Sequence, residues 1–235
     1  MGNRWSIWID VEGFSNRYKK DSSQAILFLN ELMASLYRIG KNVFSESPDR
    51  LFIHQFGDGF IVVSDFPERG PNRPIAICIA IMRHLIKKGV ATKAAISAGD
   101  WGDISSCYPQ EVMSVAEHRR FIRVGCSIMT IIPVMGMALI AAHKLSGTDS
   151  GALLLLDTSC FSCIPNGIIY KSGSATTIDW VHSDIPDIKS ICDKASLENV
   201  TSKEAEEFIG CYINQNNDVL PKNWVERTKA TLSLV

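Results

Sequence analysis

The stretch HQFGDGFIVV, residues His54–Val63, contains the turn Gly57-Asp58-Gly59 between two apolar runs. An Asp-Gly pair in this setting is a strong signal for a β-hairpin. The flanking segments, DRLFIHQF and FIVVSDF, are rich in the β-branched and aromatic residues of strands. The predicted hairpin therefore carries a carboxylate, that of Asp58, at its tip.

A second carboxylate ends the first predicted strand, RWSIWID, whose last residue is Asp10. If this strand end lies beside the hairpin tip, Asp10 and Asp58 come together, and two close carboxylates repel unless cations lie between them. Two Mg²⁺ or Mn²⁺ ions, about 3.5–4 Å apart, are the usual partners of such carboxylates at phosphate esters. Gly13 leads into a helix, so the turn is expected to offer backbone N–H groups to a triphosphate.

The order of the predicted elements indicates the fold class. Amphipathic helices are expected at 22–41 and 74–89, each closed by a glycine, and strands at 92–99 and 152–157. The order strand, helix, hairpin, helix, strand, helix, strand predicts an α+β sandwich with a mainly antiparallel sheet and helices on one face.

Composition narrows the class of protein. The 235 residues carry a formal net charge of -1, which argues against a nucleic-acid binder with a broad basic surface. The segment CSIMTIIPVMGMALIAAHKL is as long as a membrane span, but Pro133 and Gly136 favour a strand followed by a helix. We expect no membrane span and, from the start of the chain, no secretory signal.

Seven cysteines without a pairing frame indicate reduced thiols and a cytoplasmic protein. Cys160 and Cys163 form a C-x-x-C, but zinc normally takes four ligands and no second pair is present. We interpret the two residues as small, half-buried hydrophobic side chains.

The segments IDVEGFS, QFGDGFIVV, AAISAGDWGD and GMALIAAHKL resemble the catalytic domain of class III nucleotide cyclases over about residues 4–160. The resemblance implies a ferredoxin-like core within one cyclase domain, residues 1–235, with a C-terminal extension at about 161–235. It also implies that Asp10 and Asp58 hold two Mg²⁺ or Mn²⁺ ions, with the carbonyl of Val11 as a further ligand. Glu12, Gly13 and Phe14 would line the phosphates, and the product would be a 3′,5′-cyclic nucleotide.

Two departures from the family concern its ribose and base contacts. The family's Asn and Arg on the late helix correspond here to Ile140 and Lys144, and Lys144 keeps a positive charge for the phosphates without the fork of Arg. The adenine-selecting Lys and Asp correspond to His54 and Pro133. A base pocket formed by His54 and Lys93, with no evident carboxylate, suits uracil better than adenine or cytosine.

A compact, stand-alone cyclase domain of this kind is most similar to the pyrimidine cyclases of the bacterial Pycsar antiphage systems. The resemblance implies that UTP, or else CTP, is converted to a cyclic nucleotide that a separate effector protein reads. Family cyclases share their sites between two subunits, so a head-to-tail homodimer is expected, with the segment 105–125 as a candidate dimer arm. Arg119, Arg120 and Arg123 are either contacts to the partner's phosphates or a solvated basic face.

The sequence is also compatible with other functions. The protein is alternatively an adenylate or guanylate cyclase, or a degenerate cyclase fold that only binds a nucleotide or a partner. The changes at Ile140 and Lys144 favour the degenerate fold, whereas the retention of Asp10 and Asp58 opposes it. A diguanylate-type cyclase fits less well, because FGDGF lacks the acidic residue that follows the Asp in that family.

Overall fold

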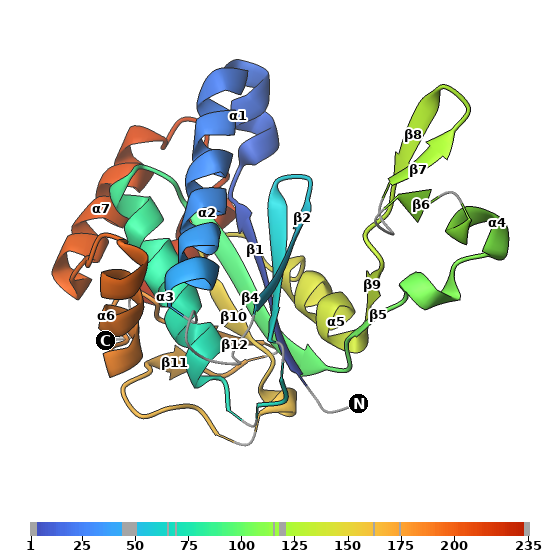
Figure 1. Cartoon of the computed structure of the whole chain (residues 1–235). Coiled ribbons are helices and arrows are strands. Elements are labelled where there is room, and N and C mark those ends of the chain that lie inside the picture. The colour runs from blue at the N-terminus through green and yellow to red at the C-terminus, as the bar shows by residue number, and fades with distance from the viewer. Residues whose placement is uncertain are drawn as a thin grey trace.

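A seven-stranded sheet forms the centre of the molecule, which is described here by a computed structural model (Figure 1). The structure describes residues 4–43, 51–64, 66–68, 70–114, 116–117, 121–161, 163–173 and 175–232. The strand order is β11-β12-β10-β4-β1-β3-β2, and only the β10–β4 pair is parallel. The prediction of a mainly antiparallel sheet is therefore confirmed. The strands are β1 (Arg4–Val11), β2 (Leu51–Phe56), β3 (Gly59–Ser64), β4 (Thr92–Gly99), β10 (Leu154–Leu156), β11 (Tyr170–Lys171) and β12 (Thr176–Ile178).

Two helices cover one face of the sheet: α2 (Ser22–Asn42) and α3 (Asn72–Lys87). Because successive side chains of a strand point to opposite faces, Ile7 and Ile9 of β1 pack into this main core, and Trp8 points the other way. Nearly every residue of α3 is buried, since further helices cover its outer side.

The other face of the sheet is covered by α5 (Met137–Ser146), which packs on β1 and β4. Leu139 of α5 joins Ile61, Val63 and Trp101 in a second apolar cluster on this side. The expectation of helices on one face thus holds for α2 and α3 but not for α5. The residues 126–145 divide into β8 (Ser127–Thr130), β9 (Val134–Met135) and α5, as predicted for a strand followed by a helix. None of the described helices is long and apolar enough to cross a bilayer.

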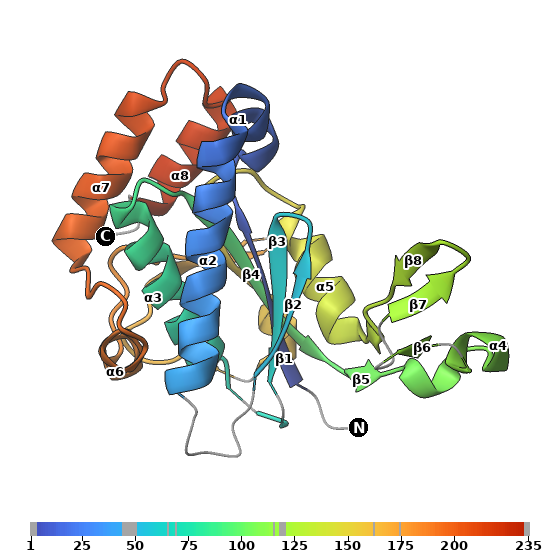
Figure 2. The same ribbon diagram turned by 45° about the horizontal axis from the view of Figure 1, so that its top comes forward.

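The C-terminal residues belong to the same hydrophobic core as the sheet. The helices α6 (Pro186–Ala195), α7 (Ser202–Gln215) and α8 (Lys222–Leu232) follow β12, and Figure 2 shows α7 and α8 beside α1 (Phe14–Lys20) and α2. The guanidinium of Arg83, on α3, is buried and donates to the carbonyl oxygens of Trp180, Val181 and Ser183. These bonds join α3 to the segment before α6 and satisfy a charge that burial alone would make unfavourable.

An arm projects from the body between β4 and α5 (Figures 1 and 2). Its stem is the short pair β5 (Gly102–Asp103) and β9 (Val134–Met135), and its tip is a three-stranded sheet. Of the arginines expected here, Arg123 lies on β7, and Arg119 and Arg120 lie outside the described residues. The remaining arm elements are the 3₁₀ turn η1 (Ser105–Cys107), α4 (Gln110–Met113), β6 (Ala116–Glu117), β7 (Phe121–Val124) and β8 (Ser127–Thr130).

The buried His84 of α3 predicts a loss of stability in mild acid. Burial, aided by the positive charges of Lys88 and Arg38, lowers the pKa of His84 to about 4, and its Nδ1 accepts from the backbone N–H of Glu198. An unfolded chain protonates this histidine near pH 6.5. The free energy of unfolding should therefore fall as the pH drops from 6.5 to about 4, by up to about 3 kcal/mol from this group.

Urea denaturation of the wild type and of His84→Asn at pH 7 and pH 5 measures this effect. Asn retains an acceptor for the Glu198 N–H but does not titrate, so its stability should change less over the same interval. An equal loss in both proteins would contradict the assignment.

Candidate functional site

The two predicted carboxylates meet at one end of the sheet. Asp10 is opposite Gly59 in the antiparallel β1–β3 pairing, and Asp58 is the residue before Gly59 in the β2–β3 turn. The pairing register therefore fixes the two carboxylates as neighbours, at the tip of the hairpin seen in Figure 1. Two distant segments of the chain supply them, as the hairpin signal predicted.

The environment of Asp10 is unfavourable for a lone negative charge. Burial raises the pKa of Asp10 to about 6, and the negative charges of Glu12 and Asp58 act in the same direction. A hydrogen bond from Trp8 and the positive charge of Lys93 oppose the shift without cancelling it. A site of this kind gains stability from a bound cation, because the cation offsets both the desolvation and the repulsion between the carboxylates.

Trp8 holds the Asp10 carboxylate in place. Its Nε1 donates to Asp10 Oδ2 over 2.8 Å, and its ring packs edge-on against His143 of α5, with 4.4 Å between ring centroids. The indole lies directly over Gly59, where an added Cβ would come within 2.5 Å of Cζ2. The glycine after Asp58 thus leaves the space that this tryptophan occupies.

Glu12 is held by a shielded ion pair and a tryptophan from the C-terminal extension. Its Oε1 is 3.0 Å from Lys93 Nζ, and the two side chains are only 11% and 13% exposed. Its Oε2 accepts from Nε1 of the buried Trp224, on α8, over 2.6 Å. Lys93 was predicted to bind the base in a pocket without a carboxylate, but it pairs with Glu12, so the premise of that prediction was wrong.

The turn after β1 has the left-handed backbone that only glycine adopts readily. Gly13 has φ 69° and precedes α1. The backbone N–H of Glu12 donates to the carbonyl of Ala91 over 3.0 Å, so it is already used inside the sheet. Of the three residues expected to line the phosphates, Gly13 and Phe14 are therefore the two whose backbone N–H groups could donate to phosphate oxygens.

The remaining predicted residues lie on β2 and α5. His54 is opposite Ile61 in the β2–β3 pairing, two residues before the row that holds Asp10. Ile140 and Lys144 lie on the exposed side of α5, with Ile140 53% exposed, and Pro133 is buried just before β9. Neither α5 residue is turned into the sheet, which leaves both accessible to a second molecule.

The oxygen donors at this end of the sheet suit a hard divalent cation. Carboxylates and backbone carbonyls are the ligands that Mg²⁺ and Mn²⁺ favour. The side chain of Val11 is buried in the main core, so this residue contributes only its backbone. Within the described ranges, no group of three or more His, Cys, Asp or Glu side chains is arranged to hold a metal ion. Asp10, Asp58 and the carbonyl of Val11 are oxygen donors of the kind that such a cation prefers, so the residues present fit it.

The C-x-x-C cysteines lie elsewhere, after β10. The thiol of Cys160 donates to Asp157 Oδ2 and to the carbonyl of Ala98, whereas Cys163 is exposed. The interpretation as half-buried side chains therefore holds for Cys160, whereas for the exposed Cys163 it was wrong.

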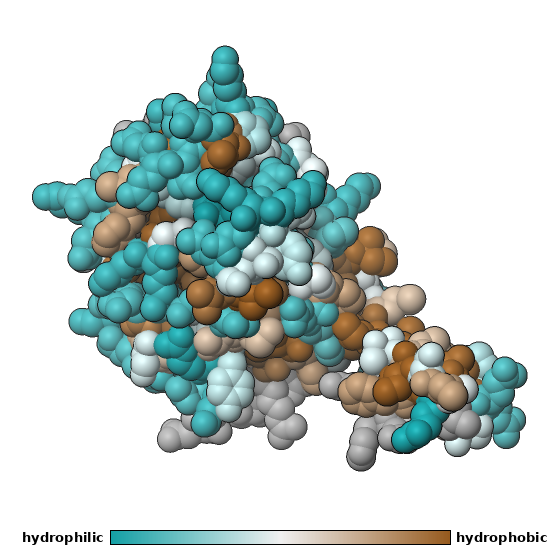
Figure 3. All heavy atoms as spheres, turned by 90° about the horizontal axis from the view of Figure 1, so that it is seen from above, coloured by the Kyte–Doolittle hydropathy of each residue, from teal (hydrophilic) through white to brown (hydrophobic). Residues whose placement is uncertain are grey.

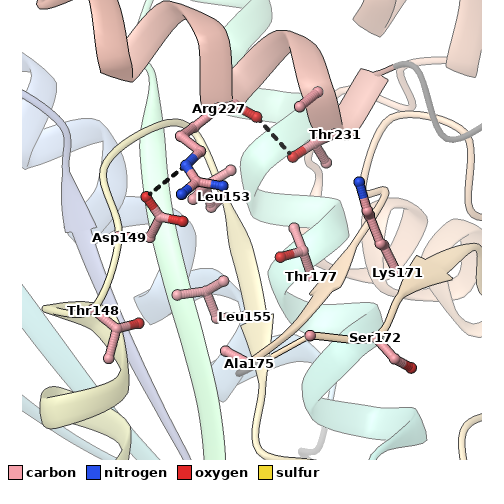
Figure 4. A pocket seen from close by; sticks show the side chains of 12 residues that line it. Thr148, Asp149, Leu153, Leu155, Lys171, Ser172, Ala175, Thr177, Arg227 and Thr231 are labelled. Atoms are coloured by element: carbon pink, nitrogen blue, oxygen red, sulfur yellow. Dashed lines mark hydrogen bonds and ion pairs between the residues drawn. The ribbon is translucent and has the colours of Figure 1, made fainter.

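A cavity of about 190 Å³ opens at the other edge of the sheet, between β11, β12 and α8 (Figure 4). Its arginine, Arg227, is paired with Asp149 at 3.3 Å, and Lys171 stands on the opposite wall. It shares no residue with the two-carboxylate site.

The sequence matches no protein-family model and no curated protein sequence. Solved structures of similar shape include nucleotide cyclase domains. The guanylyl cyclase domain of the RhoGC fusion protein from the aquatic fungus Blastocladiella emersonii is 11% identical, with a TM-score of 0.50, over 75% of this chain and 94% of that one. The adenylyl cyclase CyaB from P. aeruginosa is 13% identical, with a TM-score of 0.49, over 75% of this chain and 93% of that one.

This chain has the class III nucleotide cyclase fold. The resemblance first seen in four short motifs thus extends to the fold over about 75% of the chain. Identities of 11–13% establish the fold alone, and the chemistry of this chain depends on its own residues.

Three residues of the site escaped the sequence analysis: Trp8, His143 and Trp224. The one sequence feature that could have indicated any of these residues is Trp8 itself, which interrupts the alternation of apolar and polar residues along β1. Trp224 is far from Glu12 in sequence, and His143 lies on a helix whose docking face the sequence does not reveal.

Replacing Gly59 with alanine should disturb the carboxylate site through Trp8. The added methyl group overlaps the indole, so the variant should lose about 1–3 kcal/mol of stability and change its tryptophan fluorescence. Gly40→Ala, within α2, is the matched control, because its Cβ meets Ile53 at an ordinary 3.5 Å. Urea titrations that give equal stabilities for the two variants would refute the close approach of Trp8.

Proposed function

We propose that this protein is a metal-dependent nucleotide cyclase. The observation that carries the proposal is the pair Asp10 and Asp58, set side by side by the β1–β3 register within a cyclase fold. In the reaction, the 3′-oxygen of the ribose bonds to the α-phosphorus and the bond from that phosphorus to the bridging oxygen breaks. Pyrophosphate leaves with the electron pair, and the hydroxyl proton passes to solvent.

The chain's own groups have distinct roles in this proposal. Asp10, Asp58 and the carbonyl of Val11 would hold two Mg²⁺ or Mn²⁺ ions, which acidify the 3′-hydroxyl and offset negative charge on the phosphates. The backbone N–H groups of Gly13 and Phe14 bind phosphate oxygens, and Lys144 adds positive charge there. Glu12 contributes through its ion pair with Lys93, which keeps one carboxylate of this end of the sheet neutralised.

The base is proposed to be uracil, with His54 as its contact, and cytosine, adenine and guanine are the alternatives. Because Lys93 is paired with Glu12, His54 is the one predicted base contact that supports the choice of uracil. Cyclic UMP would then be a second messenger in bacterial antiphage defence of the Pycsar kind, made in the cytoplasm and read by a separate effector.

A second candidate function is nucleotide binding without turnover. It is favoured by the exposed Ile140, which is apolar and cannot hydrogen-bond to a ribose. The formation of a cyclic nucleotide and pyrophosphate distinguishes turnover from binding.

A head-to-tail homodimer completes the proposed enzyme. Large apolar side chains are exposed on the arm and on α5, and Figure 3 shows brown spheres on the arm and on the part of the body nearest to it. Single exposed apolar residues are ordinary, but a group of this size on a projecting arm is typical of an interaction surface. The group comprises Phe121 (51% exposed), Val124 (54%), Ile128 (69%), Met135 (57%), Met137 (57%) and Ile140.

Incubation with each of the four ribonucleoside triphosphates and Mn²⁺ should yield a cyclic nucleotide and pyrophosphate from UTP in preference to the others. Asp58→Ala should lower the rate by roughly 10²-fold or more, because the cations lose a ligand. Glu207→Ala, which removes an exposed carboxylate of α7, is the control and should retain the rate. Chromatography of the products measures both.

Binding of a triphosphate to the wild type without any cyclic product would contradict the cyclase and support the second candidate. Product from a purine triphosphate alone would retain the cyclase but overturn the choice of uracil.

Mixing two inactive variants tests the shared site. Asp58→Ala and Lys144→Ala alter opposite halves of a head-to-tail site, so each should be inactive alone. An equimolar mixture should recover about a quarter of the wild-type rate, because half of the dimers are mixed and each of these holds one intact site. Failure to recover activity, in proteins that light scattering shows to be dimers, would contradict shared sites.

A further inference from the structure

A second pocket, of about 540 Å³, lies between α1, the start of α2, the end of α3 and α7. Its volume falls within the range of about 300–1,000 Å³ that is usual for small-molecule sites. It shares no residue with the two-carboxylate site or with the cavity of Figure 4. A distinct ligand therefore has room here.

Arg17 of α1 gives this pocket an unmatched positive charge. Its guanidinium carbon lies 5.3 Å from the ring centres of both Phe28 and Tyr212. Its Nη2 donates to the hydroxyl of Tyr212 over 2.5 Å and to Asn216 Oδ1 over 3.4 Å. In the part of the chain that the structure describes, these neutral oxygens are its hydrogen-bond partners, and no carboxylate pairs with it.

The contrast with Arg227, which Asp149 neutralises, indicates what Arg17 can bind. A half-buried guanidinium held in place by aromatic rings and lacking a counter-ion attracts an anion. Phosphate suits it best, because the planar fork of arginine matches two phosphate oxygens.

The other charged residues that line the pocket are also basic. Lys87 and Lys88 stand at the pocket, and the glutamates that pair with them, Glu198 and Glu31, are outside it. None of the described residues that line this pocket is acidic. An anion bound there would meet the guanidinium of Arg17 and no carboxylate among the described lining residues.

The pocket is larger than a phosphate ion requires, and its other walls suit a flat polar ring. Phe208 offers an aromatic surface, and Gln24 and Gln215 offer amide groups that both donate and accept. We propose that this pocket binds a phosphorylated small molecule of nucleotide size, with its phosphate on Arg17. Tyr212, which lines the pocket, packs against Trp224 with 5.9 Å between ring centroids, and Trp224 in turn donates to Glu12, so two contacts connect the pocket wall to the turn after β1.

Alkylation of Cys211 tests this proposal without any substitution. Cys211 is exposed and lines the pocket, whereas Cys107, Cys126 and Cys163 are exposed elsewhere and serve as internal controls. The protein is treated with iodoacetamide in EDTA, with and without each ribonucleoside 5′-monophosphate. At ten times its Kd, a bound nucleotide should slow the modification of Cys211 roughly tenfold and leave the other three unchanged.

Two variants assign the protection to Arg17. Arg17→Gln removes the charge and should abolish protection, whereas Lys20→Gln removes a charge from the same helix outside the pocket and should retain it. Where Arg17→Gln fails to fold, Gln215→Trp narrows the pocket from an exposed position of α7 and should also abolish protection.

The proposal is overturned if no monophosphate at millimolar concentration slows the alkylation of Cys211, or if Arg17→Gln retains full protection. Equal protection by inorganic phosphate would overturn the nucleotide-sized ligand. The experiment measures no turnover, so its outcome is independent of whether the protein is a cyclase.

Discussion

The antiparallel pairing of β1 with β3 is the constraint on which the rest of the site depends. Placing Asp10 opposite Gly59 makes Asp58 its neighbour, and it also brings the indole of Trp8 over the glycine and its Nε1 onto Asp10. A slip of one residue would turn Asp10 toward α2 and α3 and bury it in an apolar core. The apolar row of β1, which includes Ile7 and Ile9, prevents this slip, because it too must face those helices. The energy that fixes the register is hydrophobic, and the carboxylates are positioned as a consequence.

Charge balance around Asp10 explains why the C-terminal extension matters. Three carboxylates gather at one end of the sheet, and Glu12 is the one that forms an ion pair with Lys93, over 3.0 Å. Trp224 of α8 adds a neutral donor to the same carboxylate. The extension thus takes part in organising the site, through a contact that draws α8 onto the turn after β1. Helix α7 of the same extension forms one wall of the Arg17 pocket, and its Tyr212 packs against Trp224 of α8.

Two of the four departures from the family pattern, Ile140 and Lys144, lie on α5, whereas His54 lies on β2 and Pro133 just before β9. The side of α5 that faces the sheet places Leu139 in the second apolar cluster and His143 against Trp8. Its outer face presents Ile140 and Lys144 together with the apolar residues of the arm. In a chain that acts alone such a surface is costly to expose, whereas in a dimer it is buried and its lysine faces the other subunit.

The sequence by itself determined the local elements: the hairpin with Asp58 at its tip, the strand that carries Asp10 near its end, and the two helices α2 and α3. Gly89 follows the end of α3 as predicted, but the prediction that Gly40 closes α2 was wrong, because that helix continues to Asn42. Each of these local elements follows from periodicity and turn chemistry over a few neighbouring residues, so no knowledge of distant contacts was needed. Only the tertiary structure decided that α5 covers the second face, that Lys93 pairs with Glu12 rather than standing in an acid-free pocket, and that Trp224 reaches the site. These contacts join residues far apart in the chain, and they depend on which faces of the elements dock, which the free energy of the whole core selects.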